Sequence, residues 1–286
     1  GDHRDLHLSI RRQRQMCIRD SYKIKGVEND YLSEYVFDSR IPDDFYKNAK
    51  NYTNILQHFK GWMIRTKEDF FDPDNFVMMD YRVQFKESTS FSYVLPLNKR
   101  EAMVEFTLFT TDLICDEDYD VMLRRYIKEV LHLDDFEITE VEKGIIPMSD
   151  FPFERYSKNK HILIGTAGGW VKPSSGYSFK NCEKNAMKLI GNIKLNRDPN
   201  FGIISKRFRW FDSLFLNVLA QKNHLGPKLF EIMYFKNNVK QILKFLDEET
   251  SISEDLKITA TFPKFLFTKA ILNVFLRRFK NSEPKK

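Results

Sequence analysis

Residues 76–110, FVMMDYRVQFKESTSFSYVLPLNKREAMVEFTLFT, decide the fold. They contain three runs rich in aromatic and β-branched residues, at 76–85, 91–95 and 102–110. The connections KESTS and PLNKRE between these runs are short and polar. This pattern predicts three consecutive antiparallel strands, and a sheet of this kind can form the wall of a pocket.

The segments that flank these strands predict a mixed α/β (α+β) fold. We expect strands at 35–37, 54–64, 136–148 and 161–164, where β-branched and aromatic residues are frequent. Apolar residues at helical spacing predict a helix at 118–131, over the antiparallel strands, and another from about residue 178 to 193. Beyond residue 201 the pattern is helical, with a loop near Gly226 and Pro227.

The composition indicates a globular protein with an anionic partner. Hydrophobic residues make up 42% of the chain and charged residues 30%, and no apolar run is long enough to cross a bilayer as a helix. The formal charge is +6 and the pI is near 9.0. Because the 26 Phe residues concentrate beside Lys and Arg near the carboxyl end, we favour a membrane surface over nucleic acid. Residues 262–280 predict either an interfacial helix or a core helix with a basic end.

Cysteine and histidine spacing gives no support for a metal site. Cys17, Cys115 and Cys182 are too far apart for a CxxC pair, and the six histidines include no HxxxH or HExxH spacing. We therefore expect no bound metal and a reduced, cytosolic setting.

The first residues do not resemble the rest of the chain. Residues 1–21, GDHRDLHLSIRRQRQMCIRDS, are basic and lack the apolar core of a signal peptide. The string RRQRQMCIRDS resembles translated sequencing-adapter read-through more than a genuine basic tail. We expect a non-native or disordered extension here and leave it out of the fold.

A glycine-rich segment, GTAGGWVKPSSGYSF, occupies residues 165–179. Its four glycines allow a close approach of the backbone to a ligand, and the helix expected after it directs N–H groups toward an anion such as a flavin pyrophosphate. The alternative is a tight turn between strand and helix with no ligand.

Six motifs occur in one order along the chain: QHFKGW, MDYR, YVLPLNKREAMVEFTLFT, EKGIIPM, GTAGGWVKPSSGYSF and FLDEETSISEDL. Together they resemble the lycopene cyclase family of flavin-dependent carotenoid enzymes, over residues 22–278. The resemblance implies an acid-catalysed, non-redox cyclisation of lycopene end groups to β-ionone rings. It also implies reduced FAD as cofactor, NAD(P)H as its reductant, and a cytoplasmic protein at the periphery of the inner membrane, where lycopene is dissolved.

The resemblance also implies roles for individual residues. The glycine-rich segment of the family lines the flavin and the inner end of the substrate tunnel. The cofactor contacts are then Gly165, Gly168, Gly169, Pro173, Ser174, Ser175, Gly176 and Tyr177. The family's catalytic acid lies in a Glu-x-Thr strand motif, which matches Glu105 here. The expected substrate contacts are Thr107, Tyr93, Asp80, Arg82 and His58.

Strand alternation supports Glu105 independently of the resemblance. Met103, Glu105 and Thr107 share one face of the strand, and the residues between them share the other, so Glu105 has apolar neighbours whichever face is buried. Burial would raise the pKa of its carboxyl and keep it protonated near neutrality, as a proton donor requires. The alternative is a solvated strand glutamate.

Other candidate residues also have structural alternatives. Asp80 and Arg82 could form a surface ion pair, and a lone histidine such as His58 is more often structural. FLDEET at 245–250 resembles the acidic motif of the plant enzymes, but it follows a helical run. We therefore interpret Asp247, Glu248 and Glu249 as a solvated helix end, with Thr250 or Ser253 capping the next helix.

These assignments divide the chain into segments. After the extension at 1–21, we expect a remnant of a partial Rossmann-like FAD-binding domain at 22–75 and an antiparallel substrate-binding sheet at 76–150. A strand-turn-helix that contacts FAD follows at 151–200, and a helical carboxyl-terminal region at 201–286. No GxGxxG occurs in these residues. We expect that loop upstream, and therefore weak FAD binding and no cyclisation by these residues alone.

Two other functions stay open. One is a flavin-dependent monooxygenase or halogenase, although Trp62, Trp170 and Trp210 stand alone rather than in a WxWxIP stretch. The other is a non-enzymatic, membrane-associated carotenoid-binding protein. The sequence does not determine the ring type, cyclisation at one or both ends, or the oligomeric state.

Overall fold

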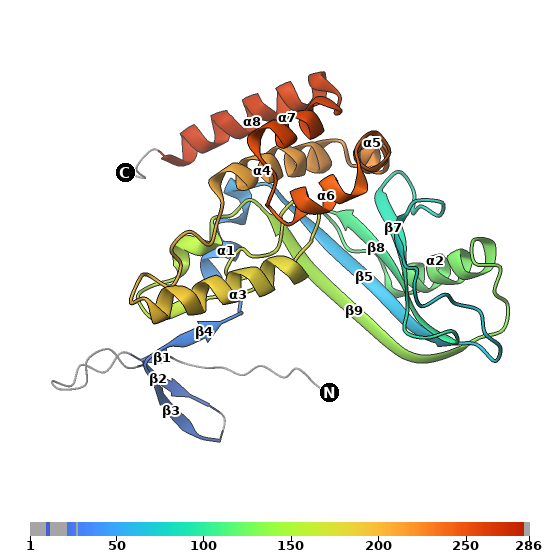
Figure 1. The fold of residues 1–286 in the computed structure, drawn as a ribbon, viewed down its shortest axis with the longest axis horizontal. Helices are drawn as coiled ribbons and strands as arrows, with labels where there is room; N and C mark the ends of the chain where they lie inside the picture. Colours follow the sequence, from blue (N-terminus) through green and yellow to red (C-terminus); the bar gives the residue numbers. More distant parts are fainter. Residues whose placement is uncertain (1–9, 12–21, 27, 283–286) are drawn as a thin grey trace. The chain divides into compact units, whose positions relative to one another are not determined.

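The computed structural model describes residues 10–11, 22–26 and 28–282. The chain forms two compact units (Figure 1). Unit 1 comprises residues 1–47, 152–171 and 178–205, and unit 2 comprises residues 48–151, 172–177 and 206–286. The expected extension at 1–21 lies outside the described residues, apart from β1 (Ile10–Arg11). The mixed α/β class predicted from the sequence is confirmed.

Unit 1 contains two small sheets and one long helix. Strands β1, β2 (Tyr22–Lys25) and β3 (Asp30–Ser33) form one sheet, and β4 (Val36–Asp38) pairs in parallel with β10 (His161–Leu163). Helix α1 (Asp43–Asn48) follows β4, and α3 (Phe179–Lys194) follows the glycine-rich segment. Its core consists of Ile162, Trp170, Leu189 and Ile203.

Unit 2 is built on a five-stranded antiparallel sheet in the order β6-β7-β8-β5-β9. The strands are β5 (Asn54–Arg65), β6 (Val77–Asp80), β7 (Thr89–Pro96), β8 (Glu101–Thr110) and β9 (Glu137–Ser149). The predicted meander is present as β6-β7-β8. The sheet begins earlier than residue 76, where we placed its boundary, because β5 pairs with both β8 and β9.

The first meander strand is shorter than predicted. We expected a strand over 76–85, but β6 ends at Asp80. Met79 has a φ of 55°, and the Arg82 N–H donates to the Asp80 carboxylate at 3.0 Å. A side-chain turn of this kind competes with the strand ladder for the backbone N–H groups, so the chain leaves the sheet there.

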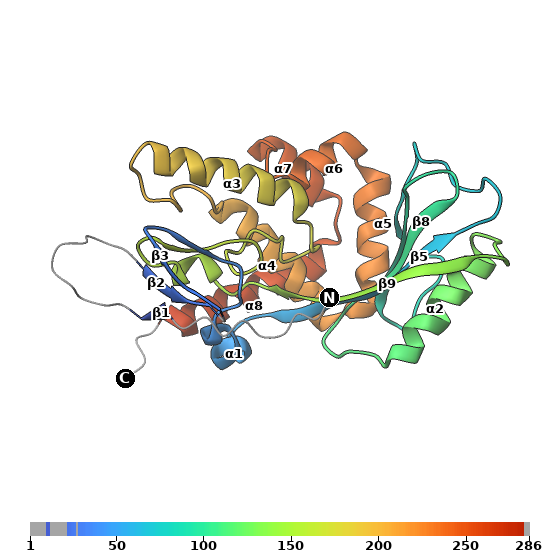
Figure 2. The same cartoon turned by 90° about the horizontal axis from the view of Figure 1, so that it is seen from below.

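Helices cover both faces of this sheet (Figure 2). Helix α2 (Asp116–Glu129) packs on the face that carries Trp62, Val104, Phe106 and Leu108. The opposite face carries Ile55, Phe91 and Phe109 and packs under the carboxyl-terminal helices. These are α4 (Lys206–Gln221), α5 (Gly226–Lys236), α6 (Val239–Leu246), α7 (Ile252–Ala260) and α8 (Lys264–Ser282). Within the described ranges, no helix is both long and apolar enough to span a membrane.

Candidate active site

Glu105 lies in a row of four residues that crosses the middle of the unit 2 sheet. Glu105 on β8 pairs with Tyr93 on β7 and with Gly61 on β5, and Gly61 pairs with Glu142 on β9. Residues directly opposite one another in an antiparallel sheet project from the same face. By strand alternation this face also carries Phe109, so Glu105 belongs to the face that packs under α4–α8.

The environment of Glu105 favours its protonated form. Burial raises the pKa of the Glu105 carboxyl to about 7, and the negative charge of Glu142 acts in the same direction. The Thr107 hydroxyl donates a hydrogen bond of 2.5 Å to Glu105 Oε1, which opposes the rise in pKa because it stabilises the carboxylate. A carboxyl with this pKa can donate a proton near neutral pH.

A small cavity of about 70 Å³ lies beside this row. Tyr93, the cross-strand neighbour of Glu105, lines it together with Gly176, Tyr177 and Tyr234. Tyr93 is partly buried, and burial, together with the Glu105 charge, raises the pKa of its phenol far above the ordinary range. The cavity therefore lies between Tyr93, the neighbour of the candidate acid, and the second half of the glycine-rich segment.

An unpaired polar atom marks one wall of the small cavity. Gln57 is buried, and its Oε1 has no hydrogen-bond partner in the structure. Gly176 lies against it: a Cβ atom added there would come within 1.6 Å of Gln57 Oε1. Gly176 also has a φ of 70°, which favours glycine, so both the conformation and the space at this position exclude a side chain.

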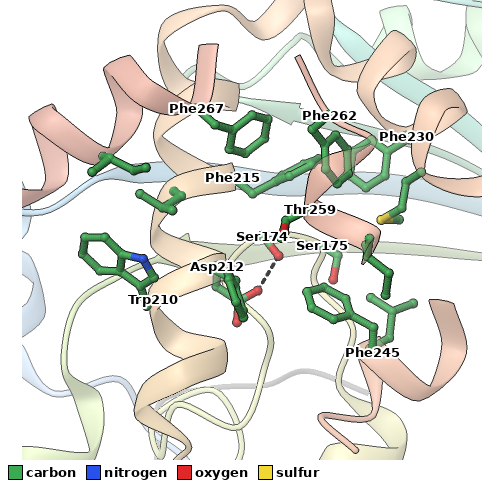
Figure 3. A pocket seen from close by; sticks show the side chains of 16 residues that line it. Ser174, Ser175, Trp210, Asp212, Phe215, Phe230, Phe245, Thr259, Phe262 and Phe267 are labelled. Atoms are coloured by element: carbon green, nitrogen blue, oxygen red, sulfur yellow. Dashed lines mark hydrogen bonds between the residues drawn. The ribbon is translucent and has the colours of Figure 1, made fainter. Parts of the chain in front are cut away.

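A larger, apolar cavity of about 240 Å³ adjoins the small one (Figure 3). The two cavities share Ser175, Phe230, Met233 and Leu246 as lining residues. Rings from several helices of unit 2 surround the larger cavity, and Ser174, Asp212 and Thr259 are among its few polar residues. An apolar chain could occupy such a cavity and present one end toward the row that contains Glu105.

A buried ion pair holds the turn at residues 172–177. The Lys172 ammonium, which is 2% exposed, lies 3.0 Å from Asp212 and 3.4 Å from Glu248. Asp212 also accepts a 2.5 Å hydrogen bond from the Ser174 hydroxyl, shown as the dashed line in Figure 3. The Gly176 N–H donates to the Lys172 carbonyl at 2.9 Å, which closes the turn. The position of Ser174 and Ser175 in the cavity wall thus depends on a charged cluster.

The interpretation of FLDEET as a solvated helix end is wrong for two of its three acidic residues. Asp247 is buried and accepts a 2.9 Å hydrogen bond from the Tyr177 hydroxyl, and Glu248 pairs with Lys172. Only Glu249 is exposed. The cap of α7 is neither Thr250 nor Ser253 but Ser251, which forms a capping box with Glu254. The segment turns inward because Tyr177 and Lys172 supply the partners of its carboxylates.

The first half of the glycine-rich segment belongs to unit 1 and forms a compact turn. Gly165 and Gly169 have φ values of 57° and 71°, and the Trp170 N–H donates to the Gly165 carbonyl at 2.9 Å. A Cβ atom at Gly168 would lie 2.5 Å from the Leu163 carbonyl oxygen, whereas one at Gly165 would meet nothing within 4 Å. Gly168 is therefore required for packing within the turn, and Gly165 leaves an open approach to the backbone.

Three of the expected substrate contacts lie on the other face of the sheet. His58 is fully buried and hydrogen-bonds Thr110 at 2.7 Å and the hydroxyl of Tyr119 in α2; burial lowers the pKa of His58 to about 4. Asp80 pairs with Arg82 and accepts a 2.8 Å hydrogen bond from Tyr126 in α2. The structure does not bring these residues together with Glu105. Strand alternation alone could not have separated His58 from Glu105, because only the cross-strand register places them on opposite faces.

Sequence reasoning missed other residues of this region. Gln57 lies in the QHFKGW motif, beside His58, but is not among the expected site residues. Glu142 and Lys172 also lie in motifs, EKGIIPM and the glycine-rich segment, whereas Asp212 lies in none, and the partners of all three are distant in the chain. Among the described residues, no cluster of three or more His, Cys, Asp or Glu side chains is placed to hold a metal ion.

A known protein family matches most of this chain. The model of the family described as "Lycopene cyclase protein" matches residues 24–273, which is most of the sequence. The chain belongs to the lycopene cyclase family. No curated protein matches this lycopene cyclase family member.

A solved structure shares the fold at low sequence identity. The flavin-dependent brominase Bmp2 is 13% identical, with a TM-score of 0.51, and the match covers 90% of this chain and 67% of the brominase. A geranylgeranyl bacteriochlorophyll reductase-like protein from Thermoplasma acidophilum is 15% identical, with a TM-score of 0.49 and coverage of 87% and 65%. This member of the lycopene cyclase family therefore spans about two thirds of the length of these proteins.

Proposed function

We propose that the protein containing this chain is a lycopene cyclase, which closes the end groups of lycopene to β-ionone rings by acid catalysis without net oxidation. The observation that carries the proposal is the Glu105 carboxyl, with its pKa raised to about 7, beside cavities whose lining is mostly apolar. A polyene has no group that forms ordinary hydrogen bonds. Its protonation therefore requires an acid that is held in an apolar site.

In the proposed reaction, Glu105 gives its proton to a carbon of the terminal double bond. The resulting tertiary cation is attacked by the next double bond, which closes the six-membered ring, and loss of a ring proton forms the final double bond. One proton enters and one leaves, so no oxidant or reductant is consumed. Thr107 positions the Glu105 carboxyl and stabilises its anion after the proton has left. Tyr93 helps to enclose the acid and exclude water from it.

The cofactor of the proposed cyclase is reduced FAD, with NAD(P)H as its reductant. The unpaired Gln57 Oε1 and the position without a side chain at Gly176 fit a ligand that approaches the backbone closely. Residues 172–177 of the glycine-rich segment, with Gln57, would hold this group. When bound, an anionic reduced flavin supplies negative charge that stabilises a nearby cation more strongly in a dry site than in water.

The substrate dissolves in membranes, and α8 offers a surface that suits contact with one. Ala270 and Val274 are buried, while another face of the helix exposes Phe265, Leu272 and Phe275 at 81%, 58% and 61%. Lys264 and Lys269 are exposed near this face. A helix with large exposed apolar residues and nearby lysines is typical of interfacial helices. We propose that the protein is cytoplasmic and peripheral to the inner membrane.

Pigment formation in cells tests the proposed function. The full coding sequence that contains these residues is expressed in lycopene-accumulating bacteria, beside its Glu105→Gln and Glu140→Gln variants. Glu140 is a matched control because it is an exposed glutamate of the same sheet. The proposal predicts yellow-orange ring-bearing carotenoid from the wild type and Glu140→Gln, and red lycopene from Glu105→Gln. An oxygenated or halogenated product would instead support a monooxygenase or halogenase, and retained but unchanged pigment a carotenoid-binding protein.

A further inference from the structure

Glu105 faces a second carboxylate across a position that has no side chain. In the row Tyr93–Glu105–Gly61–Glu142, the two glutamates lie on either side of β5, and Gly61 is the residue between them. Neighbouring strands are about 4.8 Å apart, so any other residue at 61 would place its side chain between the two carboxylates. The glycine leaves that space to the side chains of the neighbouring strands.

The Glu142 side chain lies over this gap. A Cβ atom built on Gly61 would be 3.2 Å from Glu142 Cγ and 3.5 Å from Glu142 Oε1. The Glu142 carboxylate is therefore folded toward the centre of the sheet rather than extended away from it. The same Cβ atom would lie 2.9 Å from the sulfur of Met103 on β8. Side chains of both neighbouring strands therefore occupy the space beside Gly61.

The two carboxylates have opposite environments. Glu105 is half-buried, whereas Glu142 is exposed on the edge strand β9, and the negative charge of Glu142 acts to raise the pKa of Glu105. The Thr107 hydroxyl on its own strand hydrogen-bonds Glu105, and Tyr93 on β7 lies directly opposite it. The groups that shift the pKa of Glu105 include no cation, and Glu142 is the charged group among them.

We propose that Glu142 is a positioning residue of the cyclase, which acts through Glu105 by keeping the catalytic carboxyl protonated across the gap at Gly61. The inference rests on the proposed function and adds a second acidic residue to it. A negative charge near a carboxyl disfavours loss of its proton, and the effect is moderate where one of the two groups is exposed to water. In such pairs, different environments give the two carboxylates different roles.

Titration of the Glu105 carboxyl tests the inference without flavin or polyene. Glutamate labelled with ¹³C at Cδ is incorporated into the chain, and the Glu105 signal is assigned by its loss in Glu105→Gln. The pKa of Glu105 is expected to fall by roughly 0.5 in Glu142→Gln and further in Glu142→Lys, which reverses the charge. Glu140→Gln, two residues along the same strand face, should leave it unchanged. An unchanged pKa of Glu105 in both Glu142 variants would overturn the proposal.

The pH dependence of cyclisation by the full-length protein gives the second measurement. Because Glu105 must be protonated, activity falls as the pH rises through its pKa. In Glu142→Gln this fall should move to lower pH, with activity restored by acidifying the assay and KM unchanged. Loss of activity at every pH would indicate a merely structural role and contradict the proposal. A wild type without cyclase activity would refute the proposed function, while the titration would still decide whether the two carboxylates are coupled.

Discussion

At the scale of single residues, the Glu105–Thr107 pair decides how the site works. The sequence predicted both residues, because alternation along β8 places them on one face whatever the pairing of the strand. The pKa of Glu105 could not be predicted from the sequence, because burial and the charge of Glu142 on another strand raise it. The sequence did not separate His58, Asp80 and Arg82 from Glu105, because their faces depend on strand register and on α2.

Removal of the Thr107 hydroxyl should raise the pKa of Glu105. Thr107→Val keeps the shape of this fully buried side chain but removes its 2.5 Å hydrogen bond to the carboxylate. The protonated form then persists to higher pH, so the fall in cyclase activity should move upward in pH. The change in stability should stay near 1 kcal/mol. A shift to lower pH, by ¹³C titration or by pH–rate measurement, would contradict the role given to Thr107.

Glu105 should also make folding stability depend on pH. Its pKa is raised from 4.5 to about 7 on folding, so the folded chain binds more protons than the unfolded chain between these values. The contribution of Glu105 to the free energy of unfolding is then fully present below pH 4.5. It falls by roughly 3 kcal/mol as the pH rises toward 7. Glu105→Gln should remove this loss, and Glu140→Gln should not. Urea unfolding of the three proteins between pH 4 and pH 8 provides the measurement.

At the scale of elements, the best predictions were those carried by local pattern. The meander, α2, β9 and α3 follow from periodicity and from glycine or polar breaks, and their bounds agree with the structure to within a few residues. β6 was shortened by the Asp80 turn, which a strand pattern does not reveal. FLDEET was misread because the partners of Asp247 and Glu248 lie in the 172–177 turn, about seventy residues earlier.

The Lys172–Asp212 pair should be a main support of that turn. Asp212→Ala would leave the fully buried Lys172 ammonium with only the longer contact to Glu248, and would remove the partner of Ser174. Loss of one member of a buried ion pair costs about 3–5 kcal/mol. The double variant Lys172→Met/Asp212→Ala should recover much of this loss. Chemical denaturation of the wild type, Lys172→Met, Asp212→Ala and the double variant in a double-mutant cycle checks the coupling, and additive effects would contradict it.

For the molecule as a whole, the fold class and the family could be predicted from the sequence, but the exposed helix faces could not. Residues 262–280 were compatible with a core helix or an interfacial one. The structure shows a helix with one buried face, on which Arg277 pairs with Asp150, and another face with large exposed apolar residues. Arg277 therefore fixes α8 to the sheet, and any contact with anionic lipid falls to the exposed lysines.

The exposed face of α8 should govern binding to membranes. Replacement of Phe265, Leu272 and Phe275 by serine should reduce partition onto vesicles with anionic lipid by at least about tenfold, because each exposed ring or leucine gains free energy on leaving water. Serine at Phe76 and Leu97, which are similarly exposed on unit 2, serves as the control. Equal partition of both variants in flotation assays would argue against α8 as the membrane surface.

Delivery of a proton from Glu105 to the polyene can be followed in the isotopic mass of the product. The full-length protein is given lycopene in D₂O, where the Glu105 carboxyl carries deuterium. If Glu105 has this role, the product should carry one deuterium for each ring formed and no added oxygen or halogen, and Glu105→Gln should give no product. A ring-bearing product without deuterium, or the same labelled product from Glu105→Gln, would contradict it.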